Sequence, residues 1–179
     1  GLVLSDTYAR GSQWPDGERP SPVYFAVARP RPLTPNQYGS ALVFAAADPE
    51  TLAVPKTPED LAKRLADLEK RGENLAKRFD RPDDTFQVSV DEALYFSNSD
   101  QVQNDLLGKG GKILGRILKT DGLAKRLEVA FLNTLSREPS PEESTKLNQY
   151  LEARSADEKG AWQQVLWALM TSSEMRFNR

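Results

Sequence analysis

The carboxyl-terminal segment from Gly160 to Phe177 most constrains the fold of this chain, because its pattern predicts a single helix that is apolar on more than one face. Apolar residues follow the i, i+3, i+4, i+7 spacing of one helical face: Trp162, Val165, Leu166 and Leu169. Trp167 and Met170 widen that face. Two tryptophans and several aliphatic residues bury a large apolar area, so the other helices are expected to pack around this one.

Three cap-and-proline sequences predict where other helices begin. Thr34 and Ser140 each precede a proline and a Gln or Glu at the third helical position, which is the pattern of a capping box. Thr57 precedes Pro58 in the same way and is followed by acidic residues, which suit the positive first turn. These signals predict helices over 35–47 and 58–79 and a helix that begins at Pro141.

Periodic apolar residues predict the remaining elements. Residues 92–107 are predicted as a helix interrupted near Asn98, residues 113–118 as a short helix, and 123–135 as a strongly amphipathic helix. The last three helices, joined by short links, are expected to be antiparallel neighbours. The predicted fold class is all-α, an irregular multi-helix bundle around the Trp-rich C-terminal helix.

A proline-rich stretch precedes this bundle. Six of the twelve prolines lie between Trp14 and Pro35, and their spacing forbids regular helix. The aromatic residues of this stretch favour an arm laid on the domain surface. The sequence therefore divides into an N-terminal segment with a proline-rich arm, 1–33, and a helical domain, 34–179.

The predicted helix over 58–79 carries a narrow heptad seam. Its members are Leu61, Leu65, Leu68, Gly72, Leu75 and Phe79. Gly72 is interpreted as a hole in that seam, and charged residues occupy the other faces. Two interpretations stay open: the seam packs on its own domain, as soluble monomers usually arrange such a stripe, or it docks a partner.

Composition excludes several classes of function. The 179 residues contain no Cys and no His, so the chain has no Cys or His nucleophile, no Ser-His-Asp triad, no disulfide and no zinc site of the usual kind. The net charge of −2 gives no electrostatic footprint for nucleic acid, and no apolar run is long enough to span a membrane. The first residue is Gly and not Met, which suggests a piece of a longer protein.

No residue is nominated as a catalytic, cofactor-binding or metal-binding site. The 108–112 loop, Gly-Lys-Gly-Gly-Lys, lacks the spacing of a phosphate-binding loop and is interpreted as an interhelical connection. Four aspartates, Asp80, Asp83, Asp84 and Asp91, miss the calcium-loop pattern and indicate an acidic turn. Trp162 and Trp167 are interpreted as core residues, and Trp14 as an anchor of the arm.

Four segments, in the same order, give the chain a family resemblance: Arg31–Gln37, Glu92–Asn98, Phe131–Glu143 and Val165–Asn178. The chain resembles the C-terminal domain of unknown function fifteen-fifty-three, found in large exported planctomycete proteins that often begin with a cytochrome-c-like domain. That family usually ends with an aromatic residue after the Glu and then Phe-Asn-His. This chain has Met175 and Phe177-Asn178-Arg179 at those positions.

The resemblance implies a helical C-terminal part of an exported, extracytoplasmic multidomain protein, with no established activity to carry over. Any haem would belong to the separate N-terminal domain, since this chain lacks Cys-x-x-Cys-His. The favoured hypothesis is a non-catalytic interaction or scaffolding module without a cofactor, whose partners are upstream domains of the parent protein or another cell-surface protein. The alternative is part of a hydrolase or carbohydrate-handling enzyme whose site is shared with a missing upstream domain.

Overall fold

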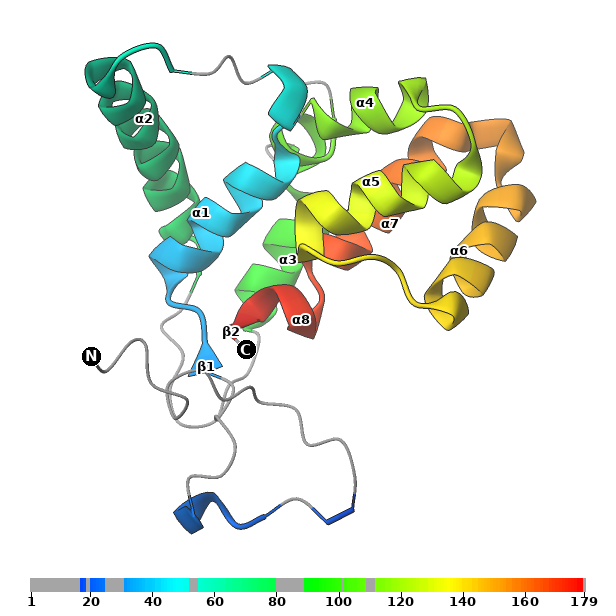
Figure 1. The fold of residues 1–179 in the computed structure, drawn as a ribbon, viewed down its shortest axis with the longest axis horizontal. Coiled ribbons are helices and arrows are strands. Elements are labelled where there is room, and N and C mark those ends of the chain that lie inside the picture. Colours follow the sequence, from blue (N-terminus) through cyan, green and yellow to red (C-terminus); the bar gives the residue numbers. More distant parts are fainter. Residues whose placement is uncertain are drawn as a thin grey trace.

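Helices account for nearly all regular structure in the computed structural model (Figure 1), which confirms the predicted all-α class. The structure describes residues 17–18, 20–24, 31–51, 55–79, 89–100, 102–108 and 112–178. Eight α-helices are described: α1 (Pro35–Ala46), α2 (Pro58–Ala76), α3 (Val90–Asn98), α4 (Ile113–Lys119), α5 (Leu123–Leu135), α6 (Pro141–Ala153), α7 (Glu158–Met170) and α8 (Ser173–Arg176). Shorter elements are η2 (Pro22–Tyr24), η3 (Pro49–Thr51), the π-helical turn η4 (Val102–Leu106), η5 (Ser155–Asp157), β1 (Arg31–Pro32) and β2 (Phe177–Asn178).

The predicted helix starts are confirmed at their caps. Thr34 and Ser140 each accept a hydrogen bond from the backbone of the third helical residue, and the side chain of that residue bonds back to the cap. Thr57 accepts from the backbone N–H of Asp60 at 3.1 Å. Side-chain caps with proline at the first helical position thus set the starts of α1, α2 and α6.

The predicted single terminal helix is wrong in its last part. α7 begins at Glu158 and ends at Met170, the short helix α8 follows, and Phe177 is in a strand. Hydroxyl groups explain the break, because Thr171 Oγ1 donates to the Trp167 carbonyl at 2.8 Å and Ser172 Oγ to the Leu169 carbonyl at 2.7 Å. Ser172 also accepts from Met175 N and so caps α8. Side chains of this kind compete with the helical backbone bonds.

The buried residues form one hydrophobic cluster, but it has two central helices where α7 alone was predicted. The predicted face of α7 is buried, with Trp162 1% and Leu166 0% exposed. Trp167 departs from that prediction, since it is 37% exposed and donates its Nε1 hydrogen to the Phe96 carbonyl. The second central helix is α1, which contacts α2, α4, α5 and α8 and buries Tyr38 and Leu42. α1 therefore joins the two sides of the molecule in Figure 1.

Helices α5, α6 and α7 contact one another in pairs, so the part of the prediction that made them neighbours is confirmed. Figure 1 shows α7 behind α5, with α6 at the right-hand edge of the molecule. Asn133 of α5 donates to the carbonyls of Ala45 and Ala47 at 2.7 and 3.1 Å, and so binds the C-terminal end of α1. No described helix is both long and apolar enough to cross a bilayer.

The end of the arm pairs with the end of the chain. β1 is antiparallel to β2, with Arg31 opposite Asn178 and Pro32 opposite Phe177. Leu33 N donates to the Arg176 carbonyl at 2.8 Å, and the Leu33 side chain packs against the core. Earlier in the arm, Tyr24 is 75% exposed, so the predicted surface contact is wrong at this residue. Trp14, Phe25 and Val27 lie outside the described residues.

The heptad seam of α2 is packed over only half its length. Leu68, Leu75 and Phe79 are buried, whereas Leu61 and Leu65 are 45% and 50% exposed. Gly72 is a close contact and not a hole, because a Cβ on Gly39 of α1 would lie 2.3 Å from the Gly72 carbonyl oxygen. Glycine at both positions lets the two backbones approach.

Candidate functional site

The candidate residues of the sequence lie in several places. In the 108–112 loop the structure describes Gly108 and Lys112, and residues 109–111 lie outside it. Asp91 is exposed in the first turn of α3, whereas Asp80, Asp83 and Asp84 lie outside the described residues. Trp162 is in the core, as predicted.

Arg137 connects the start of α6 to α8. Its guanidinium donates to both carboxylate oxygens of Glu143 at 2.8 and 2.7 Å, and to both oxygens of Glu174 at 2.9 and 2.8 Å. The hydrogen bonds from Arg137 lower the pKa of Glu143 to about 2, and the Ser140 backbone N–H adds to this effect. In turn the two carboxylates raise the pKa of Arg137. Bidentate pairs of this kind are strong and fix geometry.

Arg176 connects α8 to α3 and α1. It forms an ion pair with Glu92, and its guanidinium lies 3.9 Å from the centre of the Tyr38 ring. Glu92 is 3% and Arg176 is 9% exposed, and burial lowers the pKa of Arg176. Tyr38 donates its hydroxyl hydrogen to the Met170 carbonyl at 2.8 Å, and burial raises the pKa of Tyr38 to about 12. The buried charge is therefore paired and stacked on an aromatic face, as burial of an arginine requires.

The four sequence segments that carry the resemblance meet around α8. Arg31–Gln37 contributes β1, Glu92–Asn98 contributes Glu92, Phe131–Glu143 contributes Arg137 and Glu143, and Val165–Asn178 contains α8 and β2 themselves. Their polar residues bind one another and the core. A structural role thus accounts for these residues, of which the sequence predicted only the capping boxes of Thr34 with Gln37 and of Ser140 with Glu143.

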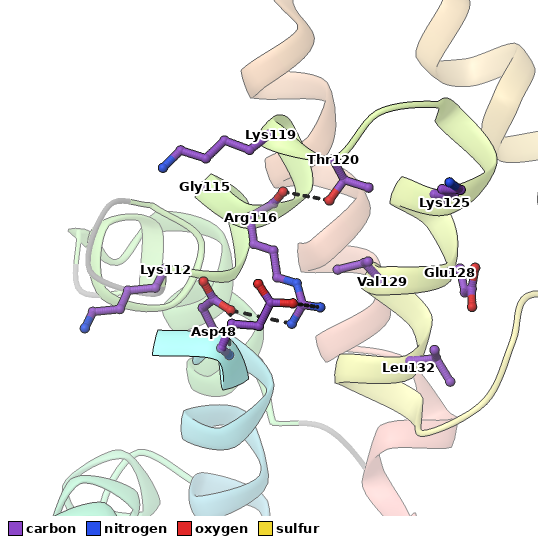
Figure 2. A pocket seen from close by; sticks show the side chains of 11 residues that line it. Asp48, Lys112, Gly115, Arg116, Lys119, Thr120, Lys125, Glu128, Val129 and Leu132 are labelled. Carbon is purple, nitrogen blue, oxygen red and sulfur yellow. Dashed lines mark hydrogen bonds and ion pairs between the residues drawn. The ribbon is translucent and has the colours of Figure 1, made fainter. Parts of the chain in front are cut away.

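An open groove with a volume of about 970 Å³ lies between η3, α4 and α5 (Figure 2). At its centre Arg116 extends toward η3, with one guanidinium nitrogen 2.9 Å from a Glu50 oxygen and another 3.6 Å from an Asp48 oxygen. The sequence did not predict this groove, because Asp48 and Glu50 precede the other lining residues, on α4 and α5, by about 60 to 80 positions in the chain.

A second surface lies on α1 and α2. A shallow groove of about 420 Å³ runs between them, with Phe44 and Ala41 on the α1 side and Glu69 and Glu73 on the α2 side. Phe44 is 48% exposed. Leu65 lies one helical turn before Glu69 and therefore continues the α2 wall. This surface combines exposed apolar side chains with a hollow, which is typical of interaction sites.

Within the described residues, no group of three or more Asp and Glu side chains is placed to hold a metal ion. Comparison of the chain with protein-family models, with curated proteins and with solved structures gave no match.

Proposed function

We propose that this chain is a non-catalytic helical interaction module of a larger exported protein and that the N-terminal half of α2 is its docking surface. The observation that carries the proposal is the exposure of Leu61 and Leu65, 45% and 50%, on a seam that is buried in its other half. Leucines at heptad spacing are suited to packing against another helix.

The geometry of the crossing explains why this half lacks a neighbour. α1 and α2 approach most closely at Gly39 and Gly72. Beyond that point α1 continues only to Ala46, about 10 Å at 1.5 Å per residue, whereas α2 extends back to Pro58, about 21 Å. The first two turns of α2 therefore project past the end of α1, and the two helices diverge in Figure 1.

Four arginines are already paired with carboxylates of this chain, which favours a binding role for the chain over a catalytic one. Arg116, Arg137 and Arg176 each pair with carboxylates. Arg126 pairs with Glu158 and donates to the Thr120 and Leu118 carbonyls at the end of α4. These contacts hold helices together. The resemblance to the exported domain of unknown function supports a place beside other domains outside the cytoplasm, and makes an upstream domain the first partner to test.

The test measures binding of the 179-residue chain to the separately expressed domain that the resemblance places before it, by calorimetry. The double variant Leu61→Gln, Leu65→Gln is expected to weaken binding at least ten-fold, because it removes two apolar contacts without changing charge or a buried residue. Gln149→Ala on the exposed face of α6 is the matched control and is expected to leave affinity unchanged. Equal affinity of the double variant and the unchanged chain would refute the docking surface.

A hydrolase screen on glycan, ester and phosphoester substrates tests the alternative, a catalytic part that shares its site with an upstream domain. The proposal expects no turnover from the chain alone or from its mixture with that domain. Turnover that survives purification and disappears when one carboxylate is replaced would favour the enzyme hypothesis instead.

A further inference from the structure

We infer that the segment bound by the docking surface is an amphipathic helix that carries lysine or arginine beside its apolar residues. This inference rests on the proposed function, because it names the chemistry of the partner that binds the exposed half of α2. It also adds the shallow groove between α1 and α2 to the docking surface. α2 lies at one edge of the molecule, and no other labelled helix lies to its left in Figure 1.

Four residues of α2 form one row that leads from the exposed part of the seam into the groove. They are Leu61, Leu65, Glu69 and Glu73. Residues four positions apart are separated by about 6 Å along a helix, and rows of this kind are the ridges by which helices pack on one another. The first half of the row is apolar, with leucines that are 45% and 50% exposed. Its second half is acidic, with two exposed glutamates that line the groove.

The α1 wall adds an apolar side chain where the two halves of this row meet. Phe44 is 48% exposed and lines the groove together with Glu69, which is one helical turn after Leu65. The other α1 residues of the wall are uncharged: Asn36, Gln37, Ser40 and Ala41. Among the described residues that line the groove, none is basic. The surface therefore has an apolar end and an acidic end.

The two glutamates are not neutralised by the described part of the chain. Neither Glu69 nor Glu73 forms an ion pair with a described residue. Lys77 is one turn after Glu73, but its ammonium group donates to Asn74 at 3.1 Å. Like charges four residues apart on a helix repel each other. A cation supplied by a partner removes this repulsion, so the pair favours a basic ligand.

The arginines of α2 lie on the other side of its leucine seam. At 3.6 residues per turn, Arg64 and Arg71 point about 80–100° to one side of Gly72. Glu69 and Glu73 point about 60–100° to the opposite side. A partner that lies along the groove therefore meets glutamate and not arginine. Charge complementarity of this kind selects a basic partner.

A helix is the form of partner that this surface suits. Binding of an extended peptide needs an unpaired sheet edge, and binding of a polyproline segment needs a groove lined with aromatic rings. Here both walls are α-helices, and Phe44 is the one aromatic residue among the described residues that line the groove. The row on α2 predicts the partner's own row, which has two apolar residues and then two basic residues at four-residue spacing.

Three synthetic peptides of about 16 residues, each held helical by a staple on its far face, test this chemistry. All three carry leucine at two positions four residues apart, and the next two positions of the same row are lysine, glutamine or glutamate. Calorimetry at low salt is expected to rank the affinities Lys above Gln above Glu, with the Lys peptide at least ten-fold tighter than the Glu peptide. The difference should shrink as salt screens the charges, and amide chemical shifts should change in α1 and α2.

Charge reversal on α2 makes the test specific. Glu69→Lys with Glu73→Lys is expected to reverse the order, so that the Glu peptide binds more tightly than the Lys peptide. Glu128→Lys with Glu152→Lys is the matched control, since it changes the net charge equally at exposed positions of α5 and α6. The control is expected to keep the original order, and both variants should keep the circular dichroism of the unchanged chain.

The outcomes separate this inference from the proposed function. Equal affinity for the three peptides, lost in Leu61→Gln with Leu65→Gln, would overturn the basic partner and leave the docking surface in place. Loss of the order in the Glu128 and Glu152 control would show general attraction to net charge and overturn the inference. Self-association of the unchanged chain, abolished by the leucine variant, would make a second copy the occupant. No binding of the Lys peptide at about 1 mM would also overturn the inference, whereas titration with the upstream domain decides the proposed function separately.

Discussion

At the scale of single residues, Arg137 is the side chain with the most demanding contacts, because it binds two carboxylates from two elements with both arms of its guanidinium. Lysine keeps the charge but not this planar fork. Arg137→Lys is therefore expected to lower the free energy of unfolding by about 1–3 kcal/mol in urea denaturation. Arg154→Lys is the control, since the exposed Arg154 side chain donates one described hydrogen bond, to Gln164, and otherwise lies over the Tyr150 ring, and it is expected to cost below about 0.5 kcal/mol.

The contact between Arg137 and Glu143 also predicts how the free energy of unfolding depends on pH. The pKa of Glu143 is about 2 in the folded chain against an ordinary 4.5. A carboxyl group with a lowered folded pKa stabilises the fold above pH 4.5, and this contribution is lost as the pH falls toward 2. Urea midpoints measured from pH 6 to pH 2 should decline, and Glu143→Gln should flatten part of that decline. An identical slope in the variant would mean that Arg137 does not hold this carboxylate in solution.

At the scale of helices, replacement of glycine by alanine is expected to have opposite effects on stability at two positions. A Cβ on Gly39 would lie 2.3 Å from the Gly72 carbonyl oxygen, and a Cβ on Gly72 would lie 2.5 Å from Ser40 Oγ, but a Cβ on Gly115 meets no atom within 4 Å. Gly39→Ala is expected to cost about 2 kcal/mol or more, because two backbones have to move apart. Gly115→Ala is expected to gain about 0.5–1 kcal/mol. Denaturant curves of both variants test the α1–α2 crossing, and an equal sign for the two changes would contradict it.

The two tryptophans of α7 give a second comparison within one element. Trp162 is 1% exposed and Trp167 is 37% exposed. Trp162→Ala is expected to lower the free energy of unfolding by about 3–5 kcal/mol through lost burial and the cavity left behind. Trp167→Ala is expected to cost clearly less. Equal losses in chemical denaturation would show that exposure does not distinguish the two rings.

Local signals made the helix starts predictable, whereas the end of α7 and the packed length of the α2 seam could not be predicted from the sequence. The capping boxes of Thr34 and Ser140 depend on residues three positions apart, so the sequence displays them. The end of α7 was missed because Thr171 and Ser172 also fit a continuing helix until their hydroxyl groups are seen to bind carbonyls. The seam of α2 was predicted by periodicity, but periodicity does not say where α1 ends.

The two candidate surfaces also differ in how far the sequence predicts them. Leucine spacing already indicated α2 as a docking helix, and the exposure of Leu61 and Leu65 says which half of it is available. By contrast, the groove could not be foreseen, because Asp48, Arg116 and Lys125 come together only through the packing of three elements.

At the scale of the whole molecule, the segment just before α1 is held against the last described residues of the chain. β1 pairs with β2, and Leu33 donates its N–H to the Arg176 carbonyl just before β2. α8 supplies Glu174 to Arg137 and Arg176 to Glu92. α8 and β2, residues 173–178, therefore connect the arm, α1, α3 and the start of α6. The described part of the arm before β1 contributes much less, since Val23 and Tyr24 are 76% and 75% exposed.

The contacts of α8 predict that a deletion at the carboxyl-terminal side destabilises the fold. Removal of residues 173–179 is expected to cost about 3–5 kcal/mol, because Glu92 would remain buried without Arg176 and Arg137 would lose one of its two carboxylates. Replacing Glu92 by Gln in the shortened chain should restore part of the loss, since it removes the unpaired buried charge. A shortened chain as stable as the full one, or no recovery with Gln, would show that α8 lies on the molecule without holding it together.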